Sequence, residues 1–170
     1  MRRILLIIIV LAGLSSFIPH TRPNEAGGDE RPYLSPTHIC YDAAAGKAYI
    51  SLSTAGKIAV LDLRSSRLLE YIDLPFNPGQ TVLSGDSKTL FVSDMESEGK
   101  IHLLSLKSKK IEKSIPVGHT PDALAITPDG NLLFAANRFT NDVSVIDLKK
   151  FQTIKTISVD RDPKVLSLSP

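Results

Sequence analysis

Short apolar runs separated by polar turns dominate most of this chain. In its clearest stretch the runs are ALAIT, LLFAAN, VSVIDL and TIKTISV. They are rich in aliphatic and β-branched residues, and Gly, Pro, Asn and Asp divide them at intervals of about 8–12 residues, which predicts strands. Within VSVIDL, Val143 and Val145 share one face and Ser144 points the other way, as in a strand. No segment has an apolar i, i+3, i+4 stripe long enough for the helices of a helical solenoid.

The runs belong to a unit that repeats along the chain. Prolines recur at spacings of 42, 43 and 42 residues: Pro36, Pro78, Pro121 and Pro163. An aromatic residue follows thirteen positions after each of the first three: Tyr49, Phe91 and Phe134. Four short strands in a repeat of this length predict one blade of a β-propeller. We therefore expect an all-β fold of four-stranded antiparallel blades, with three blades and the start of a fourth forming an open arc. The expected units are 36–77, 78–120, 121–162 and the partial 163–170.

The aromatic residue of each unit is expected on the second strand, between neighbouring blades. On this expectation Phe134 has blades on both sides, whereas Tyr49 lacks a preceding neighbour.

The third unit resembles the YVTN-type propeller repeat of bacteria and archaea. That pattern runs G-x-x-P, an apolar strand, S/T-P-D-G, an aromatic-V-x-N strand end, V-x-V-I-D and I-x-V-G. It is matched here by GHTPDALAITPDGNLLFAANRFTNDVSVIDLKKFQTIKTISV, residues 118–159. The first two units match more loosely, since Leu52 and Asp94 replace Asn137. The WD40 repeat is the rival interpretation, but its Trp-Asp dipeptide is absent here because the chain contains no Trp. The resemblance implies an exported propeller.

The first 35 residues have the pattern of an export signal. Arg2 and Arg3 precede an uncharged apolar run from Ile4 to Leu14, and small residues follow at Ser15 and Ser16. We expect a signal peptide over 1–16, a flexible linker over 17–35, and export to the periplasm or cell surface. An uncleaved anchor helix is the alternative, and it would be the chain's only membrane contact.

Composition restricts the partners. The 20 basic and 18 acidic residues give a formal charge of +2, and the two leader arginines account for that excess. The sequence contains no basic patch with interleaved aromatic residues, so nucleic-acid binding is not predicted. The single cysteine, Cys40, forms no disulfide within the chain and is expected to be a buried structural thiol.

Two loop residues are candidates for a binding site. His119 and Arg161 occupy equivalent positions two residues before a repeat proline, on loops that approach the axis of a propeller. The other copies carry Leu34 and Phe76 there, so a solvated loop histidine is the alternative. For His38 the expectation is packing or a backbone hydrogen bond, and for His102 a place on an open face. No histidine pair has a metal-ligand spacing, and neither a metal nor another cofactor is predicted.

The acidic residues predict turns rather than catalysis. Asp62 and Asp147 end a third strand, where a short carboxylate accepts backbone N–H groups, and Asp129 belongs to a hairpin. A further group, Asp94, Glu96 and Glu98, is expected on a loop and lacks the glycine and closing glutamate of an EF-hand. No catalytic motif is present, so no catalytic residue is predicted.

Two function classes remain. The first is an exported binding or interaction module, non-enzymatic, with an unknown protein or small-molecule ligand at the propeller face. The second is the N-terminal part of a periplasmic redox or catalytic propeller, since YVTN-type blades resemble those of haem-binding nitrite reductases and quinoprotein amine dehydrogenases. Residues 163–170 match the opening of the third unit, so we expect the chain to be the N-terminal part of a longer protein.

Overall fold

A computed structural model describes residues 34–168 of the chain. The expected signal peptide 1–16, and all but the last two residues of the expected linker 17–35, lie outside the described residues. Within residues 34–168 there is no helix of the length and apolarity needed to cross a membrane.

The described residues form twelve strands in three four-stranded antiparallel sheets. The first blade contains β1 (Pro36–Asp42), β2 (Lys47–Leu52), β3 (Lys57–Asp62) and β4 (Arg67–Asp73). The second contains β5 (Pro78–Leu83), β6 (Thr89–Asp94), β7 (Lys100–Ser105) and β8 (Lys110–Pro116). The third contains β9 (Pro121–Ile126), β10 (Leu132–Asn137), β11 (Asp142–Asp147) and β12 (Gln152–Ser158). The predicted all-β architecture of four-stranded antiparallel blades is confirmed.

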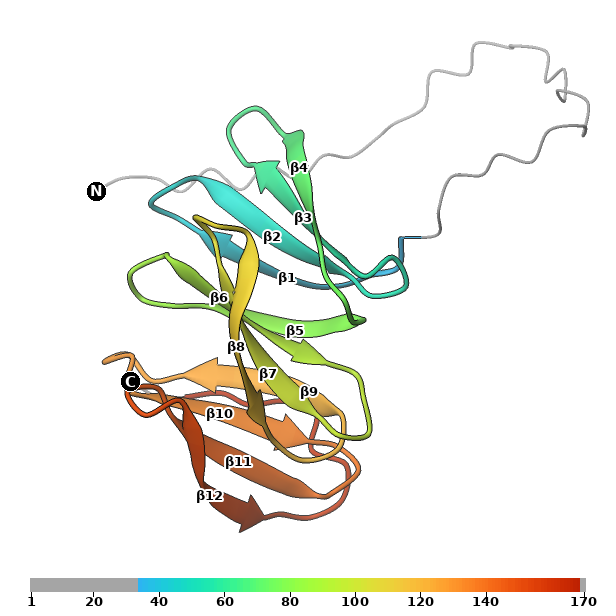
Figure 1. The fold of residues 1–170 in the computed structure, drawn as a ribbon, viewed down its shortest axis with the longest axis vertical. Coiled ribbons are helices and arrows are strands. Elements are labelled where there is room, and N and C mark those ends of the chain that lie inside the picture. Colours follow the sequence, from blue (N-terminus) through green and yellow to red (C-terminus); the bar gives the residue numbers. More distant parts are fainter. Residues whose placement is uncertain (1–33, 169–170) are drawn as a thin grey trace, which may run out of the picture. The chain divides into compact units, whose positions relative to one another are not determined.

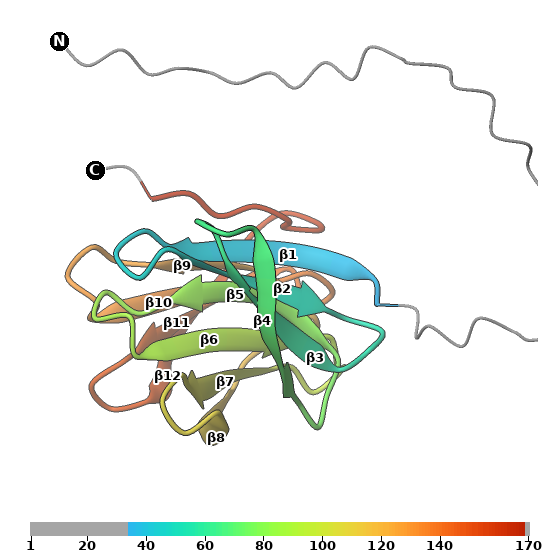
Figure 2. The same ribbon diagram turned by 90° about the horizontal axis from the view of Figure 1, so that it is seen from above.

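Within each blade the strands pair in chain order, and the three blades follow one another as an arc (Figure 1). The first strands β1, β5 and β9 lie beside one another (Figures 1 and 2). The last strands have fewer neighbours in the next blade, so the sheets fan out from a common inner edge. This arrangement brings the loops before the first strands and between the second and third strands to one end of the sheets, which we call the loop end.

The repeat extends to irregularities of the backbone. The pairing of the third with the fourth strand shifts register after Val60, Leu103 and Val145, which are equivalent positions. One residue of each outer strand is thereby left without a cross-strand partner, as in a β-bulge. Positive φ values recur at equivalent turn positions: Ser66, Lys109 and Phe151.

The turn carboxylates act as predicted. Asp62 and Asp147 accept backbone N–H groups of the residues that follow them. Asp129 accepts the Asn131 N–H at 3.0 Å and the Thr127 hydroxyl, and Gly130 takes a φ of 68°. The hydrogen bonds to the Asp129 carboxylate lower its pKa to about 2, so the group that stabilises this hairpin is charged at neutral pH.

The aromatic residues of the first two units pack against the following blade. Tyr49 lies with Leu90 and Leu104 of the second blade and is 5% exposed. Phe91 lies with Leu133 and Ile146 of the third blade and is 3% exposed. Tyr49 thus lies between its own blade and the next, as expected, whereas the expectation of a blade on both sides of Phe134 is wrong.

Phe134, on β10, is only half-buried. The physical reason is the direction of the side chain: in all three units the aromatic ring points toward the following blade. A complete blade covers Tyr49 and Phe91 from that side, whereas Phe134 has only the segment after β12.

The expected first strand of a fourth blade is not formed within residues 163–168. Leu166 packs against the cluster of Ala123, Ala136 and Val143, together with Phe134. The Leu166 side chain thus covers the face of the third blade against which a fourth blade would pack. The backbone forms no ladder because no neighbouring strand among the described residues pairs with it.

Candidate functional site

The loop end carries an exposed aromatic and cationic cluster, formed by His119, Arg138, Phe139 and Arg161. His119 comes from the loop between β8 and β9, and Arg161 from the segment after β12. Arg138 and Phe139 lie between β10 and β11. Backbone hydrogen bonds join these loops, from Arg138 N–H to the Thr120 carbonyl at 3.0 Å and from Phe139 N–H to the His119 carbonyl at 3.3 Å. Two adjoining loops therefore hold His119, Arg138 and Phe139 in place.

Phe139 is the centre of this cluster. Its ring is 58% exposed, and the His119 ring meets its edge at 5.0 Å between centroids. The Arg138 guanidinium lies 5.1 Å from the centre of the same ring, a cation–π distance. Arg161 lines a hollow of about 260 Å³ together with Arg138 and Phe139. The structure thus places both predicted residues, His119 and Arg161, next to Phe139.

The charges at this hollow are partly paired. Arg138 Nε lies 2.6 Å from an Asp162 oxygen, and Lys164 Nζ lies 3.1 Å from the other. These donors lower the pKa of the Asp162 carboxyl, with Arg138 the larger cause. Arg161 is exposed, and its backbone N–H bonds to the Asp160 side chain. The site offers an apolar ring beside the Arg138 and Arg161 side chains, with the Asp162 carboxylate also at the hollow, which suits a ligand that has apolar and charged groups.

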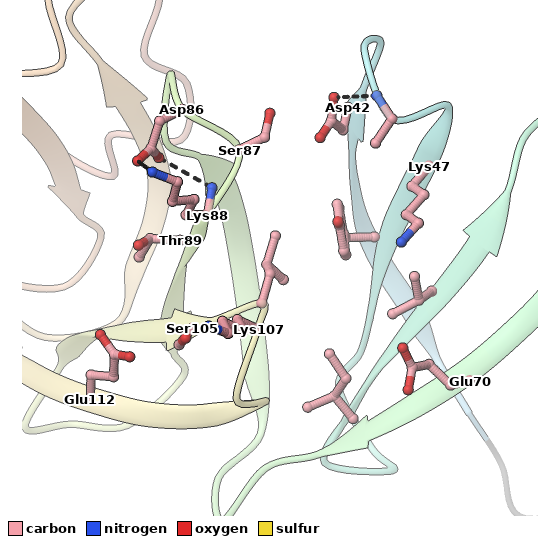
Figure 3. A pocket seen from close by; sticks show the side chains of 15 residues that line it. Asp42, Lys47, Glu70, Asp86, Ser87, Lys88, Thr89, Ser105, Lys107 and Glu112 are labelled. Atoms are coloured by element: carbon pink, nitrogen blue, oxygen red, sulfur yellow. Dashed lines mark hydrogen bonds and ion pairs between the residues drawn. The ribbon is translucent and has the colours of Figure 1, made fainter.

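A larger groove of about 610 Å³ lies between the first two blades at the opposite end of the sheets (Figure 3). Its rim carries both signs of charge, with Asp42, Lys47 and Glu70 on the first blade facing Asp86 and Lys88 on the second. Apolar side chains form its floor: Tyr49, Val60, Ile72 and Leu106. Burial and the nearby Asp42 carboxylate raise the pKa of Tyr49.

A second groove, of about 410 Å³, occupies the corresponding place between the second and third blades. There Phe91 takes the position of Tyr49, and Phe151 lies at the rim. Because the hollow recurs where blades stack, we attribute it to the geometry of the repeat and not to one dedicated ligand. The loop end is therefore the stronger candidate site.

His102 lies where sequence reasoning did not place it. It was expected on an open face, but it is 7% exposed between β6 and β8. Its Nε2 lies 3.1 Å from Asp94 Oδ2, and its Nδ1 lies 2.8 Å from Ser114 Oγ. Asp94 was expected on a loop with Glu96 and Glu98; instead it is the last residue of β6 and is 3% exposed.

The sequence signal for this contact was the register. Asp94 and His102 lie on adjacent antiparallel strands, and Ser114 pairs directly with His102. The apolar pattern of β7 located the strand but not the face on which His102 lies.

The remaining candidates have structural roles. His38 makes the expected backbone hydrogen bond, with Nε2 3.1 Å from the Thr81 carbonyl oxygen, and burial lowers its pKa. Cys40 is a free, half-buried thiol whose pKa is raised by burial. Among residues 34–168 there is no group of three or more His, Cys, Asp or Glu side chains placed to hold a metal ion.

Three fanned four-stranded blades define a β-propeller fold, present here as an open arc. No family model matches the chain. In sequence it is similar to the uncharacterized protein YncE of Salmonella typhi, with 33% identity over 55 residues. The corresponding protein of Salmonella typhimurium strain LT2 has 31% identity over 55 residues. Both matches cover 32% of this chain and 16% of the relative.

Solved structures share the fold at low identity. Kuenenia stuttgartiensis hydrazine synthase superposes with a TM-score of 0.72 and 21% identity, over 88% of this chain and 42% of that one. A putative 6-phosphogluconolactonase of Bacteroides fragilis superposes with a TM-score of 0.68 and 20% identity, over 77% of this chain and 41% of that one. A putative 6-phosphogluconolactonase of Bacteroides uniformis has a TM-score of 0.65 and 22% identity, over 76% of this chain and 42% of that one. The chain spans less than half of each of these propeller-like proteins, and at this identity the likeness shows the fold alone.

Proposed function

We propose that the chain is part of an exported YVTN-type β-propeller that works as a binding module, with its ligand contacts at the loop end. The exposed Phe139, with His119, Arg138 and Arg161 around it, carries the proposal. Aromatic and arginine side chains dominate binding energy at interfaces, and a rigid frame limits the entropy lost on binding. The G-x-x-P and S/T-P-D-G motifs and the partial similarity to YncE support the YVTN assignment.

The alternative, a redox or catalytic propeller, has less support from these residues. It rests on the resemblance of the blades, and a propeller frame serves many unrelated chemistries. The loop-end cluster presents an exposed aromatic ring beside a guanidinium group, which supports binding as the function we propose.

The binding surface is testable with peptides selected by phage display on the intact chain. Phe139→Ser is expected to weaken their binding about 30-fold, because a central aromatic contact contributes about 2 kcal/mol. Arg161→Ser is expected to weaken it less, since a rim charge contributes less. Isothermal titration calorimetry gives both values.

Matched controls lie at the opposite end of the sheets. Leu63, 49% exposed, and Lys107, also exposed, sit on turns after a third strand. Leu63→Ser and Lys107→Ser are expected to leave the affinities unchanged. If the peptides bind the control variants more weakly than the wild type but bind Phe139→Ser as tightly, their binding site lies away from the loop end. That result would contradict the proposal.

Export is the second part of the proposal. The charged start and the apolar run to Leu14 support cleavage after Ser15 or Ser16. N-terminal sequencing of the protein recovered from the periplasm of an expressing cell is expected to begin at Ser16 or Phe17. Intact protein beginning at Met1 in the cytoplasm would contradict export, and intact protein in the membrane would favour an anchor.

A further inference from the structure

Three side chains of the second blade form a continuous hydrogen-bonded chain from the interior to the surface. Asp94 Oδ2 lies 3.1 Å from His102 Nε2, and His102 Nδ1 lies 2.8 Å from Ser114 Oγ. Asp94 and His102 are 3% and 7% exposed, whereas Ser114 is exposed on the outer strand β8. A hydroxyl at the surface therefore has a buried imidazole behind it and a buried carboxylate behind the imidazole.

The partners determine which way each hydrogen bond runs. An ionised carboxylate only accepts, so His102 Nε2–H donates to Asp94 in the neutral ring. His102 Nδ1 then has a free lone pair, and the Ser114 hydroxyl donates to it. The other carboxylate oxygen, Asp94 Oδ1, accepts the Lys100 backbone N–H at 2.9 Å. This order of nucleophile, base and orienting carboxylate is the one that activates a serine.

The imidazole is also fixed in orientation. Phe76 stacks on it, with 3.8 Å between ring centroids and 16° between ring planes. Phe76 comes from the loop before β5, so the ring is held from outside its own strand. A preorganised base has less conformational freedom to lose when the reaction proceeds.

The propeller frame does not require these residues. The equivalent positions of the first blade are Leu52, Ala59 and Tyr71, and those of the third are Asn137, Ser144 and Thr156. In the third blade the Asn137 side-chain nitrogen donates to Ser144 Oγ at 2.8 Å, with no ionisable base between them. The fold therefore accommodates apolar, amide or hydroxyl side chains at the two interior positions.

We propose that Ser114 is a nucleophile that accepts the acyl group of a carboxylic ester, with His102 as its general base and Asp94 as a positioning residue. This goes beyond the proposed binding function and is independent of it. Ser114 Oγ forms a bond to the ester carbonyl carbon while its proton moves to His102 Nδ1. The bond from that carbon to the alkoxy oxygen then breaks, and the leaving alcohol takes the proton. Water, deprotonated by His102, releases the acid and restores Ser114.

A serine-directed fluorophosphonate tests the nucleophile on the intact chain. The Ser114 oxygen would displace fluoride from phosphorus, and peptide mass spectrometry locates the adduct. Ser108, exposed on the preceding turn, is the internal control. Ser114 is expected to react roughly 10²–10⁴-fold faster than Ser108, the range for general-base assistance. The preference is expected to vanish on denaturation, and equal rates in the folded chain would overturn the proposal.

Two variants separate activation from a structural cross-link. Asp94→Asn mimics Asn137 of the third blade, so the blade is expected to fold. The substitution removes the negative charge behind His102. With the amide oxygen kept on the Lys100 N–H, the amide nitrogen faces His102 Nε2 as a donor and no longer favours the Nε2–H tautomer. The fluorophosphonate rate of this variant is expected to fall at least 100-fold, and Ser114→Ala is expected to abolish the adduct and the release of p-nitrophenol from p-nitrophenyl acetate. If Asp94→Asn lowers only the unfolding midpoint and leaves the labelling rate of Ser114 unchanged, the hydrogen bonds among the three side chains have only a structural role. The proposal then fails.

Discussion

Replacing Phe91 by alanine is expected to lower the free energy of unfolding by about 3–5 kcal/mol. The ring is 3% exposed and lies between the second and third blades, against Leu133 and Ile146. Its removal loses the transfer free energy of an aromatic side chain and leaves a cavity between two sheets. Because both blades are held by their own strand ladders, the sheets cannot close this cavity fully.

Chemical denaturation of the intact chain measures the loss, and Phe134→Ala is the matched control. Phe134 occupies the equivalent position but is half-buried, since only Leu166 and its neighbours cover it. Its loss is expected to be clearly smaller. Equal losses for the two variants would show that the third blade has a complete neighbour, and would contradict the packing direction described above.

Gly99→Ala is expected to be the most disruptive single-methyl addition. A Cβ at Gly99 would overlap the Gly118 carbonyl oxygen and would lie 2.7 Å from Pro121 Cδ. Gly118 belongs to the connection between the second and third blades, and Pro121 is the first residue of β9. Val117 N–H already bonds to the Gly99 carbonyl at 2.9 Å. Backbone must move to admit the methyl group, so a destabilisation of about 1–3 kcal/mol or more is expected.

Gly85→Ala provides the control for that substitution. A Cβ at Gly85, in the turn between β5 and β6, would meet no atom within 4 Å. Thermal unfolding should therefore give nearly the same midpoint for Gly85→Ala as for the wild type, and a lower one for Gly99→Ala. A Gly99→Ala midpoint equal to the wild-type value would mean that the two loops are not in contact.

The fold could be predicted because the same residue pattern occurs three times along the chain. The proline spacing located the blade boundaries, and period-two alternation located the strands, since both depend on local backbone geometry. Turn residues such as Asp129 and Gly130 could also be predicted, because their hydrogen bonds and φ values involve only near neighbours.

The direction in which the aromatic residues pack could not be predicted. Alternation shows that Phe91 and Leu103 differ from Leu90 and Val92 in the face they occupy, but not which face meets the next blade. That choice depends on the twist of the sheets and on the hand of the arc. The error over Phe134 has this origin.

The site was predictable in part. Equivalent loop positions brought His119 and Arg161 to the same end, as a repeat requires. Phe139, the centre of the cluster, has no aromatic or cationic counterpart at the equivalent loop positions of the other units and was missed. The hydrogen bonds from Asp94 through His102 to Ser114 cross three strands. To predict them would have required the register of the strands as well as their assignment.

Hydrogen exchange of the intact chain with and without a selected peptide tests the central claim, that the loop end is the binding surface. Mass spectrometry is expected to show slower amide exchange on binding in 118–120, 138–141 and 160–162, the segments that carry His119, Phe139 and Arg161. The turns at the opposite end, including 63–66 and 106–109, are expected to exchange at unchanged rates. Protection confined to those turns, with none around Phe139, would contradict the account.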